Sequence, residues 1–542
     1  MSVVKSPLLR PALIFLGLVI ISCAPIWSVD YFINQDGSAH VYSAYLMLEL
    51  LKNNPQVHEL YALNSLAVPN SSGHWLLVIL LNFFSAYTAT KIIVTLTLAG
   101  LIGAIGFLRW RIFGTDGLTT SLLAGAAIGF NWLWFGGFYN FLLGVIFLAI
   151  TVGLYYGWRE NLTVRRLIAL VLLIILTYLS HIVSFVVLAG SLGLLAITAQ
   201  PPNKKTAIIR TLIAFLPIIP LMILYKVASG SGGEAGFYPV WRNLESPFSI
   251  MSWISQIRNA DPFILISRRA FPFSTTYSAY FAFFTPIIWI SGAFLLLIVP
   301  AFKKYSDADE RYKLLPFLIL SGFCILTAFF APDDFGLNNG SILRERFLIC
   351  GFLLAVPLFR TDVFPIFERA AQVFLIFVIL FQTAVVWEYA LQTDKEAKEF
   401  LTAGQFIEPG DALMSIIVPN QTKRFHPTPM TGMANFLGIE RKITAWDNYE
   451  IGHNLFPIVA KNKADQKFVL EMAAASAALL DVESHNLPEK TRNFDDVLAK
   501  NRDKLTKLLI WGDAEKIRRN AEQWFDPQPV FESGRITILR RR

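Results

Sequence analysis

A carboxylate and an imidazole stand four residues apart just beyond the first apolar segment of the chain. Asp36 and His40 share one face of a helix at this spacing. An ionisable pair at a membrane–water boundary can perform acid–base chemistry on a lipid-carried substrate. Asp36 is therefore our candidate general base, with His40 orienting the carboxylate or contacting a phosphate. The alternatives are that Asp36 only caps the helix that follows and that His40 is only solvated.

Two arginines are the strongest candidates for binding an anion. Arg344 and Arg346 flank Glu345 at the predicted mouth of a spanning segment. Guanidinium groups match phosphate oxygens in bidentate geometry, so a lipid phosphate would suit them. The alternative is that both are snorkelling arginines at a helix end. Weaker candidates for lining the same site are Asp30, His181, Arg268 and Arg269.

Composition identifies the kind of protein that must position these residues. The chain is 54% hydrophobic and 16% charged, and its mean hydropathy is +0.51. Soluble domains carry about 25% charged residues, so the sequence predicts a polytopic membrane protein. The net charge of +8 lies in short basic clusters between apolar runs, where membrane topology requires positive residues. This distribution argues against nucleic-acid binding.

Hydropathy and basic clusters together predict a mostly α-helical fold with about eleven transmembrane helices. Lys5 before the first span and Arg10 at its start place the N-terminus in the cytoplasm. The apolar segment 74–87 is too short for an ordinary span, so we interpret it as an interfacial helix. The predicted spans are 9–27, 90–108, 118–134, 138–157, 166–180, 183–199, 209–226, 278–300, 313–331, 346–360 and 367–389.

The chain divides into two predicted domains. Residues 1–392 form the membrane domain, and residues 393–542 have the composition of a soluble domain. Alternating runs and a helical stretch in the second part predict a small extracytoplasmic α/β domain. Its neighbourhood of Tyr449 and Glu450 looks like a loop and suggests no role. The membrane domain carries outer loops at 28–89, 227–277 and 332–345.

Several kinds of chemistry find no support in the sequence. Cys23, Cys324 and Cys350 lie in apolar segments and offer neither a disulfide framework nor a CxxC metal motif. No glycine-rich nucleotide loop, HExxH or GxSxG motif appears in a suitable context. Nucleotide-driven and zinc-protease mechanisms are therefore not indicated. No cofactor is predicted with certainty, a divalent metal stays open, and its ligands are unassigned.

The arrangement of these features resembles the GT-C superfamily of membrane glycosyltransferases, in the branch of protein O-mannosyltransferases and aminoarabinose transferases. The similar features are the first outer loop with Asp36, the arginines Arg344 and Arg346, the many spans and the C-terminal soluble domain. The chain departs from the family's Asp-Glu pair, since Gln35 and Gly37 flank Asp36. It also lacks the Trp-Trp-Asp signature of oligosaccharyltransferases.

The resemblance implies an inverting glycosyltransferase that moves a sugar from a polyprenyl-phosphate-linked donor to an extracytoplasmic glycan, lipid or protein. Asp36 would be the base, Arg344 and Arg346 would hold the donor phosphate, and His40 and His181 would line the site. The protein would lie in a bacterial inner membrane, with the C-terminal domain outside the cytoplasm and membrane lipids among its partners. The alternatives are an O-antigen ligase- or polymerase-like envelope enzyme and a non-catalytic lipid or solute transporter.

Overall fold

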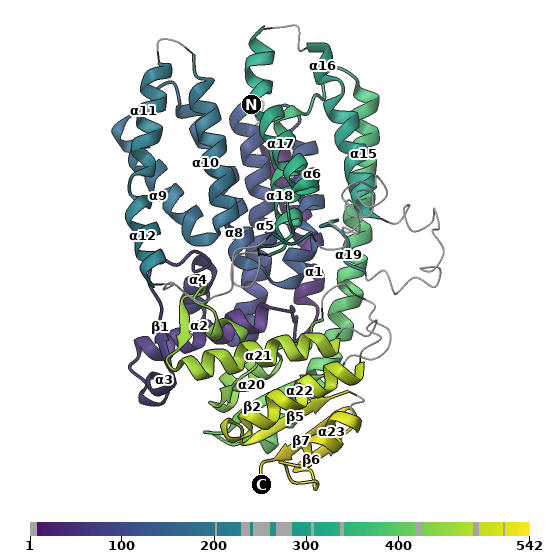
Figure 1. Cartoon of the computed structure of the whole chain (residues 1–542). Coiled ribbons are helices and arrows are strands. Elements are labelled where there is room, and N and C mark those ends of the chain that lie inside the picture. The colour runs from purple at the N-terminus through teal and green to yellow at the C-terminus, as the bar shows by residue number, and fades with distance from the viewer. Residues whose placement is uncertain are drawn as a thin grey trace.

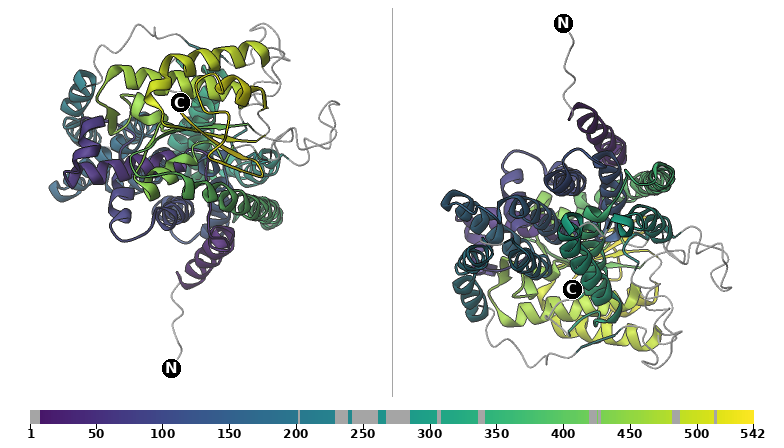
Figure 2. Two further views of the ribbon diagram at one scale, coloured as in Figure 1. Left: turned by 90° about the horizontal axis from the view of Figure 1, so that it is seen from below. Right: turned by 90° about the horizontal axis from the view of Figure 1, so that it is seen from above.

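A helical bundle stands on a smaller mixed region of strands and helices in this computed structural model (Figure 1). The structure describes residues 8–200, 203–228, 239–241, 261–266, 285–304, 308–335, 341–418, 425, 428–480, 487–512 and 515–542. We call residues 402–542 the C-terminal region and residues 28–85, between the first and second long helices, loop 1. Seen from below, the C-terminal region lies across one end of the bundle (Figure 2).

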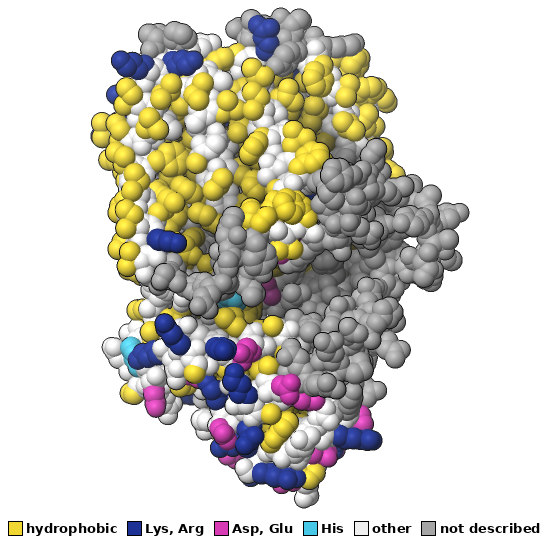
Figure 3. Space-filling model, in the orientation of Figure 1, with side chains coloured by type: hydrophobic (Ala, Val, Ile, Leu, Met, Phe, Trp, Pro, Cys, Tyr) yellow, Lys and Arg dark blue, Asp and Glu magenta, His cyan; other side chains and the backbone are white. Residues whose placement is uncertain are grey.

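The bundle has the composition and dimensions of a membrane-embedded part. Among the described residues, six helices are long and apolar enough to cross a bilayer. Exposed leucine, isoleucine and phenylalanine side chains cover them, and Figure 3 shows them as an apolar belt above a charged lower part. The spanning segments include α1 (Leu9–Trp27), α5 (Ala86–Phe113), α8 (Tyr139–Trp158), α11 (Lys204–Phe215) continuing into α12 (Ile218–Ala228), α17 (Ala308–Phe330) and α19 (Pro365–Leu401).

Shorter helices complete the bundle. They are α4 (Ser72–Leu81), α6 (Leu118–Gly129), α7 (Trp132–Gly136), α9 (Val164–Ser180), α10 (Ile182–Ile197), α15 (Pro286–Ile298), α16 (Ala301–Lys304) and α18 (Leu343–Ala355). The predicted mostly helical membrane fold is confirmed, whereas the count of eleven spans is not established. The predicted span 118–134 is broken between α6 and α7, where the Asn131 side chain caps α7 by accepting a hydrogen bond from the Trp134 amide.

The C-terminal region is built on a five-stranded mixed sheet in the order β3-β2-β5-β7-β6. The strand β5 (Lys507–Trp511) is buried along its whole length, as expected for a central strand. It pairs in parallel with β2 (Ala412–Ile417) and antiparallel with β7 (Ile536–Arg540). The predicted α/β character is confirmed. The remaining elements are β3 (Thr444–Ala445), β6 (Phe531–Ser533), α20 (Ala434–Arg441), α21 (Lys463–Leu480), α22 (Leu487–Asn501) and α23 (Glu515–Ala521).

The long helix α19 connects the two parts without a break. It begins at Pro365 within the bundle and ends at Leu401, so the predicted domain boundary at 392/393 falls inside a helix. Ionisable side chains also lie at the other end of the bundle. There Arg109 donates to the carbonyls of Pro357 and Phe359 at 3.2 and 3.0 Å, and Arg360 forms an ion pair with Glu310.

Loop 1 is held between the bundle and the C-terminal region. Its helix α2 (Gly37–Leu51) is apolar around most of its circumference and almost wholly buried, as expected of such a helix. It packs against α20, and the Tyr42 hydroxyl donates to the Ile443 carbonyl at 2.9 Å. After α3 (Pro55–Leu60), the strand β1 (Tyr61–Leu63) pairs antiparallel with β4 (Ile458–Ala460). Residues distant in the sequence therefore meet at one interface.

The β1–β4 pairing can be tested by cross-linking. Ala62 lies opposite Val459, and facing Cβ atoms in such pairs are about 4.5–5.5 Å apart, near disulfide range. We expect the double variant Ala62→Cys/Val459→Cys to form a disulfide on mild oxidation, seen as a shift in non-reducing electrophoresis. The native cysteines are buried and should not interfere. In the control Leu63→Cys/Val459→Cys the side chains point to opposite faces, so equal cross-linking there would contradict the register.

Candidate active site

One buried carboxylate joins loop 1 to the C-terminal region. Glu450 Oε2 accepts a hydrogen bond from Ser43 Oγ at 2.5 Å and lies 2.9 Å from His74 Nε2. Its Oε1 forms an ion pair with His40 Nδ1. The two imidazoles are themselves close, with His40 Nδ1 at 3.3 Å from His74 Nε2. We call His40, His74 and Glu450 the His–His–Glu cluster.

Three short elements position the cluster. His40 lies in the first turn of α2 and shares a helix face with Ser43, three residues later. His74 lies in the first turn of α4. Glu450 lies in a single 3₁₀ turn (Tyr449–Gly452) that Asn448 caps by accepting the Glu450 amide at 3.1 Å. The Asn448 side chain also donates to Ser43 Oγ at 2.9 Å, so the capping residue and the cluster share one hydrogen-bond network.

The outer nitrogens of both rings are held by backbone carbonyls. His74 Nδ1 lies 3.1 Å from the Asn70 carbonyl and 3.3 Å from Asn140 Nδ2. The His40 ring is hydrogen-bonded to the Gly137 backbone. Gly137 has φ +93°, and a Cβ there would lie 2.7 Å from the Gly37 nitrogen. Only glycine therefore lets this turn approach α2 closely enough to hold the ring.

Electrostatics favour an ionised Glu450. Burial alone would raise the pKa of this carboxyl, but the charges and hydrogen bonds of His40 and His74 outweigh burial and lower the pKa well below its usual range. For His40, burial and the neighbouring charge shift the pKa in the opposite directions to those for Glu450. Burial would lower the pKa of the imidazole, and the Glu450 charge and hydrogen bond leave it raised. The cluster is thus a site that attracts positive charge.

Asp36 stands at the start of α2, beside the cluster. Its backbone N–H donates to the Gly136 carbonyl at 2.9 Å. It occupies the N-cap position, but its side chain makes no capping hydrogen bond; the side chain is instead hydrogen-bonded to Gln35 and Tyr449. Burial raises the pKa of Asp36 to about 6, with His40 opposing and Glu450 adding to the shift. A carboxyl with this pKa can exchange protons near neutral pH.

Arg346 reaches the same site from the bundle. It lies in the first turn of α18 with 8% of its surface exposed. Its guanidinium lies over the rings of Phe138 and Phe141, 5.6 Å from each centroid, and Nη1 donates to the Ser341 carbonyl at 2.9 Å. Its Nε has no hydrogen-bond partner among the described residues. Its positive charge interacts with the carboxyl groups of Glu345 and Asp36.

His181 is the fourth predicted site residue in this neighbourhood. It is buried at the N-cap of α10, where Nδ1 accepts a hydrogen bond from the Val183 amide at 3.2 Å. Its ring packs edge-on against Phe141, with centroids 5.3 Å apart, and it interacts electrostatically with Arg346. The structure therefore brings Asp36, His40, His181 and Arg346 to one end of the bundle.

The remaining predicted residues lie elsewhere. Arg344 Nε donates to the Ala328 carbonyl at 2.9 Å, and Nη1 lies 3.6 Å from Asp333, so its side chain packs against the end of α17. Asp30 is exposed and lies 2.7 Å from Lys398 of α19. Arg268 and Arg269, with most of the predicted outer loop 227–277, lie outside the described residues.

Sequence reasoning missed three residues of this site: His74, Tyr449 and Glu450. His74 was read only as the start of an interfacial segment, and the other two only as part of a loop. His74 and Glu450 are 376 residues apart, and neither belongs to a local motif. Only the pairing of loop 1 with the C-terminal region brings them together.

The His–His–Glu cluster is the one group among the described residues whose side chains could hold a metal ion. One ligand atom from each residue lies within 4.8 Å of the others, and all three residues are buried. Two imidazole nitrogens and one carboxylate oxygen form a donor set that proteins use for zinc and similar dications. The arrangement can therefore either share protons or hold a metal ion.

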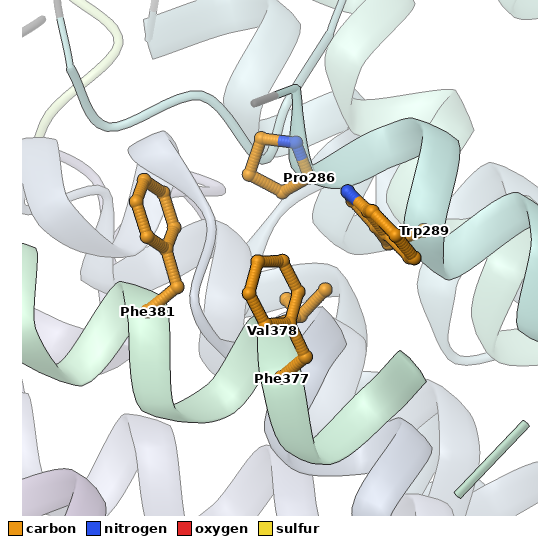
Figure 4. Close-up of a pocket in the computed structure, with 5 residues that line it drawn as sticks. All are labelled: Pro286, Trp289, Phe377, Val378 and Phe381. Atoms are coloured by element: carbon orange, nitrogen blue, oxygen red, sulfur yellow. The ribbon is translucent and has the colours of Figure 1, made fainter. Parts of the chain in front are cut away.

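A recess between α15 and α19 lies apart from these residues. It is lined by Pro286, Trp289, Phe377, Val378 and Phe381 (Figure 4). These side chains carry no charge and offer one indole N–H as their polar group. The recess therefore offers no charged group that would bind a phosphate.

Fold and site together define an integral membrane protein with a buried ionisable site where its bundle meets a soluble region. No protein-family model matches the chain, and no curated protein matches its sequence. Among solved structures, ArnT from Cupriavidus metallidurans bound to undecaprenyl phosphate is similar at 11% identity and a TM-score of 0.46, with 97% of each chain covered.

A second similar structure is the Archaeoglobus fulgidus oligosaccharyltransferase in complex with Zn and sulfate. It shares 11% identity at a TM-score of 0.47, covering 96% of this chain and 71% of the other.

Replacing the buried carboxylate should loosen the attachment of the C-terminal region. In Glu450→Gln the charge-assisted hydrogen bonds to the two histidines are lost, and one such bond is worth about 1.5–3 kcal/mol. We expect the melting temperature in detergent to fall by about 3–12 °C for each bond lost, at roughly 2–4 °C per kcal/mol. The exposed residue Glu408 provides the control, since Glu408→Gln should change stability by no more than about 0.5 kcal/mol. Equal melting of both variants would contradict the proposed importance of Glu450.

Proposed function

We propose that this protein is a membrane glycosyltransferase that moves a sugar from a polyprenyl-phosphate-linked donor to an extracytoplasmic acceptor. In this proposal the N-terminus is cytoplasmic, and the C-terminal region lies outside. The observation that carries it is the meeting of Asp36 and Arg346. Asp36 supplies a carboxylate and Arg346 supplies a guanidinium at one site. This site lies at the end of the apolar bundle that faces the polar C-terminal region.

Asp36 supplies the base in the proposed reaction. With its pKa near 6, the carboxyl is ionised at neutral pH yet basic enough to accept the proton of an acceptor hydroxyl. The oxygen then attacks the anomeric carbon, the bond from that carbon to the phosphate oxygen breaks, and the polyprenyl phosphate leaves with the electron pair. A single displacement of this kind inverts the configuration at the anomeric carbon. Tyr449, hydrogen-bonded to Asp36, orients the carboxylate.

Arg346 stabilises the negative charge that develops on the leaving phosphate. A cation in buried, largely apolar surroundings acts more strongly on such a charge than one in water. The described residues leave its Nε without a partner, so a phosphate oxygen can accept this hydrogen bond. The polyprenyl chain would remain in the bilayer beside the apolar belt (Figure 3). In this proposal the hydrocarbon chain of the donor lies beside the bundle, its phosphate lies at Arg346, and its sugar lies toward Asp36.

The variant Asp36→Asn tests the assignment of the base and separates an enzyme from a transporter. Asparagine keeps the size of the side chain and caps a helix about as well, so the protein should fold and melt as before. Sugar transfer from a polyprenyl-phosphate donor should fall by about 10²–10⁴-fold, the usual contribution of a positioned base.

Glu49 provides the matched control, because it lies on the same helix and pairs with Lys52. Glu49→Gln should transfer sugar at the normal rate. Full activity in a well-folded Asp36→Asn protein would remove Asp36 from the mechanism.

The two arginines should behave differently when each is replaced by alanine. Arg346→Ala loses a charge-assisted contact worth about 1.5–3 kcal/mol, so KM for the donor should rise by roughly 10–100-fold. Arg346→Lys should recover part of this loss, because lysine keeps the charge without the fork. Arg344→Ala should mainly lower the melting temperature, since Arg344 is bonded to Asp333 and the Ala328 carbonyl. Donor titrations with melting curves check both, and unchanged donor affinity in Arg346→Ala would contradict the assignment.

A further inference from the structure

The inward-facing atoms of the His–His–Glu cluster repel one another electrostatically, and this repulsion points to a bound cation. A carbonyl oxygen can only accept a hydrogen bond, so the ring proton of His74 faces Asn70 and that of His40 faces Gly137. Each inward nitrogen then presents a lone pair. Together with the carboxylate, two lone pairs and a negative charge face one another at hydrogen-bond distances. Such an arrangement is stable only with protons or a metal ion between the three groups.

The distances fit a metal ion of zinc size. Zinc binds nitrogen and oxygen ligands at about 2.0–2.2 Å in tetrahedral geometry, which places neighbouring ligand atoms roughly 3.3 Å apart. Here His40 Nδ1 and His74 Nε2 are 3.3 Å apart, and His74 Nε2 is 2.9 Å from Glu450 Oε2. A small outward movement of the ligands would seat the ion. The three ligand atoms already lie within 4.8 Å of one another.

The surrounding residues have the form of a metal site's second shell. Histidine ligands usually donate their other N–H to a carbonyl or carboxylate, and ligating carboxylates are themselves hydrogen-bonded. Both features are present, through the carbonyls of Asn70 and Gly137 and through Ser43 Oγ on Glu450. His74 and Glu450 are each 0% exposed and His40 is 5% exposed, so water competes little for the ion.

We propose that His40, His74 and Glu450 bind a zinc-type dication that ties the C-terminal region to loop 1. A donor set of two nitrogens and one oxygen favours zinc, nickel or copper over magnesium and calcium, which take oxygen ligands. The ion fixes α2 and the turn that carries Tyr449, and thereby the position of Asp36. This inference rests on the cluster alone and does not depend on the proposed sugar transfer.

Metal titration of the full-length protein tests the proposal. The protein is purified in detergent on an affinity tag without histidines, stripped with a chelator, and titrated with Co²⁺ and then Zn²⁺. We expect saturation at one ion per chain, the visible absorption bands of tetrahedral Co²⁺, displacement by Zn²⁺, and a rise in melting temperature. The absence of both the absorption and the melting shift in the unmodified protein would overturn the proposal.

Matched variants locate the site. His40→Asn and His74→Gln place an amide nitrogen where Nδ1 and Nε2 now lie, so hydrogen bonds persist while an imidazole ligand is lost. Each should weaken Co²⁺ binding by more than the roughly 10–100-fold that a second-shell change costs, and Ser43→Ala should fall within that range. His58→Gln is the control, since His58 lies on loop 1 with its ring against the Leu50 carbonyl.

Unchanged Co²⁺ affinity in both histidine variants would also overturn the proposal. If neither variant folds, X-ray absorption of the cobalt-loaded unmodified protein decides, because two imidazoles in the first shell are expected and fewer than two would contradict the site. Every one of these measurements is independent of glycosyl transfer, so loss of the proposed function would leave the result intact.

Discussion

The architecture depends on one carboxylate that belongs to one part of the chain and is neutralised by another. Glu450 is fully buried, and its partners His40, His74 and Ser43 all come from loop 1. A buried charge without partners would be prohibitive, so the C-terminal region is stable in this position only when loop 1 lies against it. The apolar faces of α2 and the β1–β4 pairing add area and register to this contact. The charge supplies its specificity.

The contact between loop 1 and the C-terminal region also positions the candidate site. The turn that carries Glu450 also carries Tyr449, and the helix that carries His40 begins at Asp36. Fixing the ion pair therefore fixes Tyr449 against Asp36. Arg346 belongs to the bundle and approaches from the membrane side over Phe138 and Phe141. The candidate site is thus assembled from three parts of the chain, and none of them contains it alone.

The sequence indicated the elements well and the site in part. Apolar runs predict helices because burial in lipid requires a continuous apolar surface, and α1, α5, α8 and α19 follow those runs. Asp36 and Arg346 could be proposed as site residues because local features mark them. The sequence alone did not show which of Arg344 and Arg346 faces the site. Residues two positions apart on a helix face different ways, so the two arginines have different surroundings. One meets Asp333 and the other the site. His74 and Glu450 were missed because only tertiary pairing relates them.

The electrostatics of Asp36 follow from this assembly. Burial raises its pKa most, the Glu450 charge adds to this rise, and His40 and the hydrogen bond from Tyr449 oppose it. Glu450 and Tyr449 belong to the C-terminal region, and His40 belongs to loop 1. A carboxyl at the free end of α2, without that region, would be solvated and would titrate near the ordinary value of about 3.9. It would then be ionised but weakly basic. The C-terminal region therefore contributes to the raised pKa of Asp36, because it helps to bury the carboxyl and brings the Glu450 charge near it.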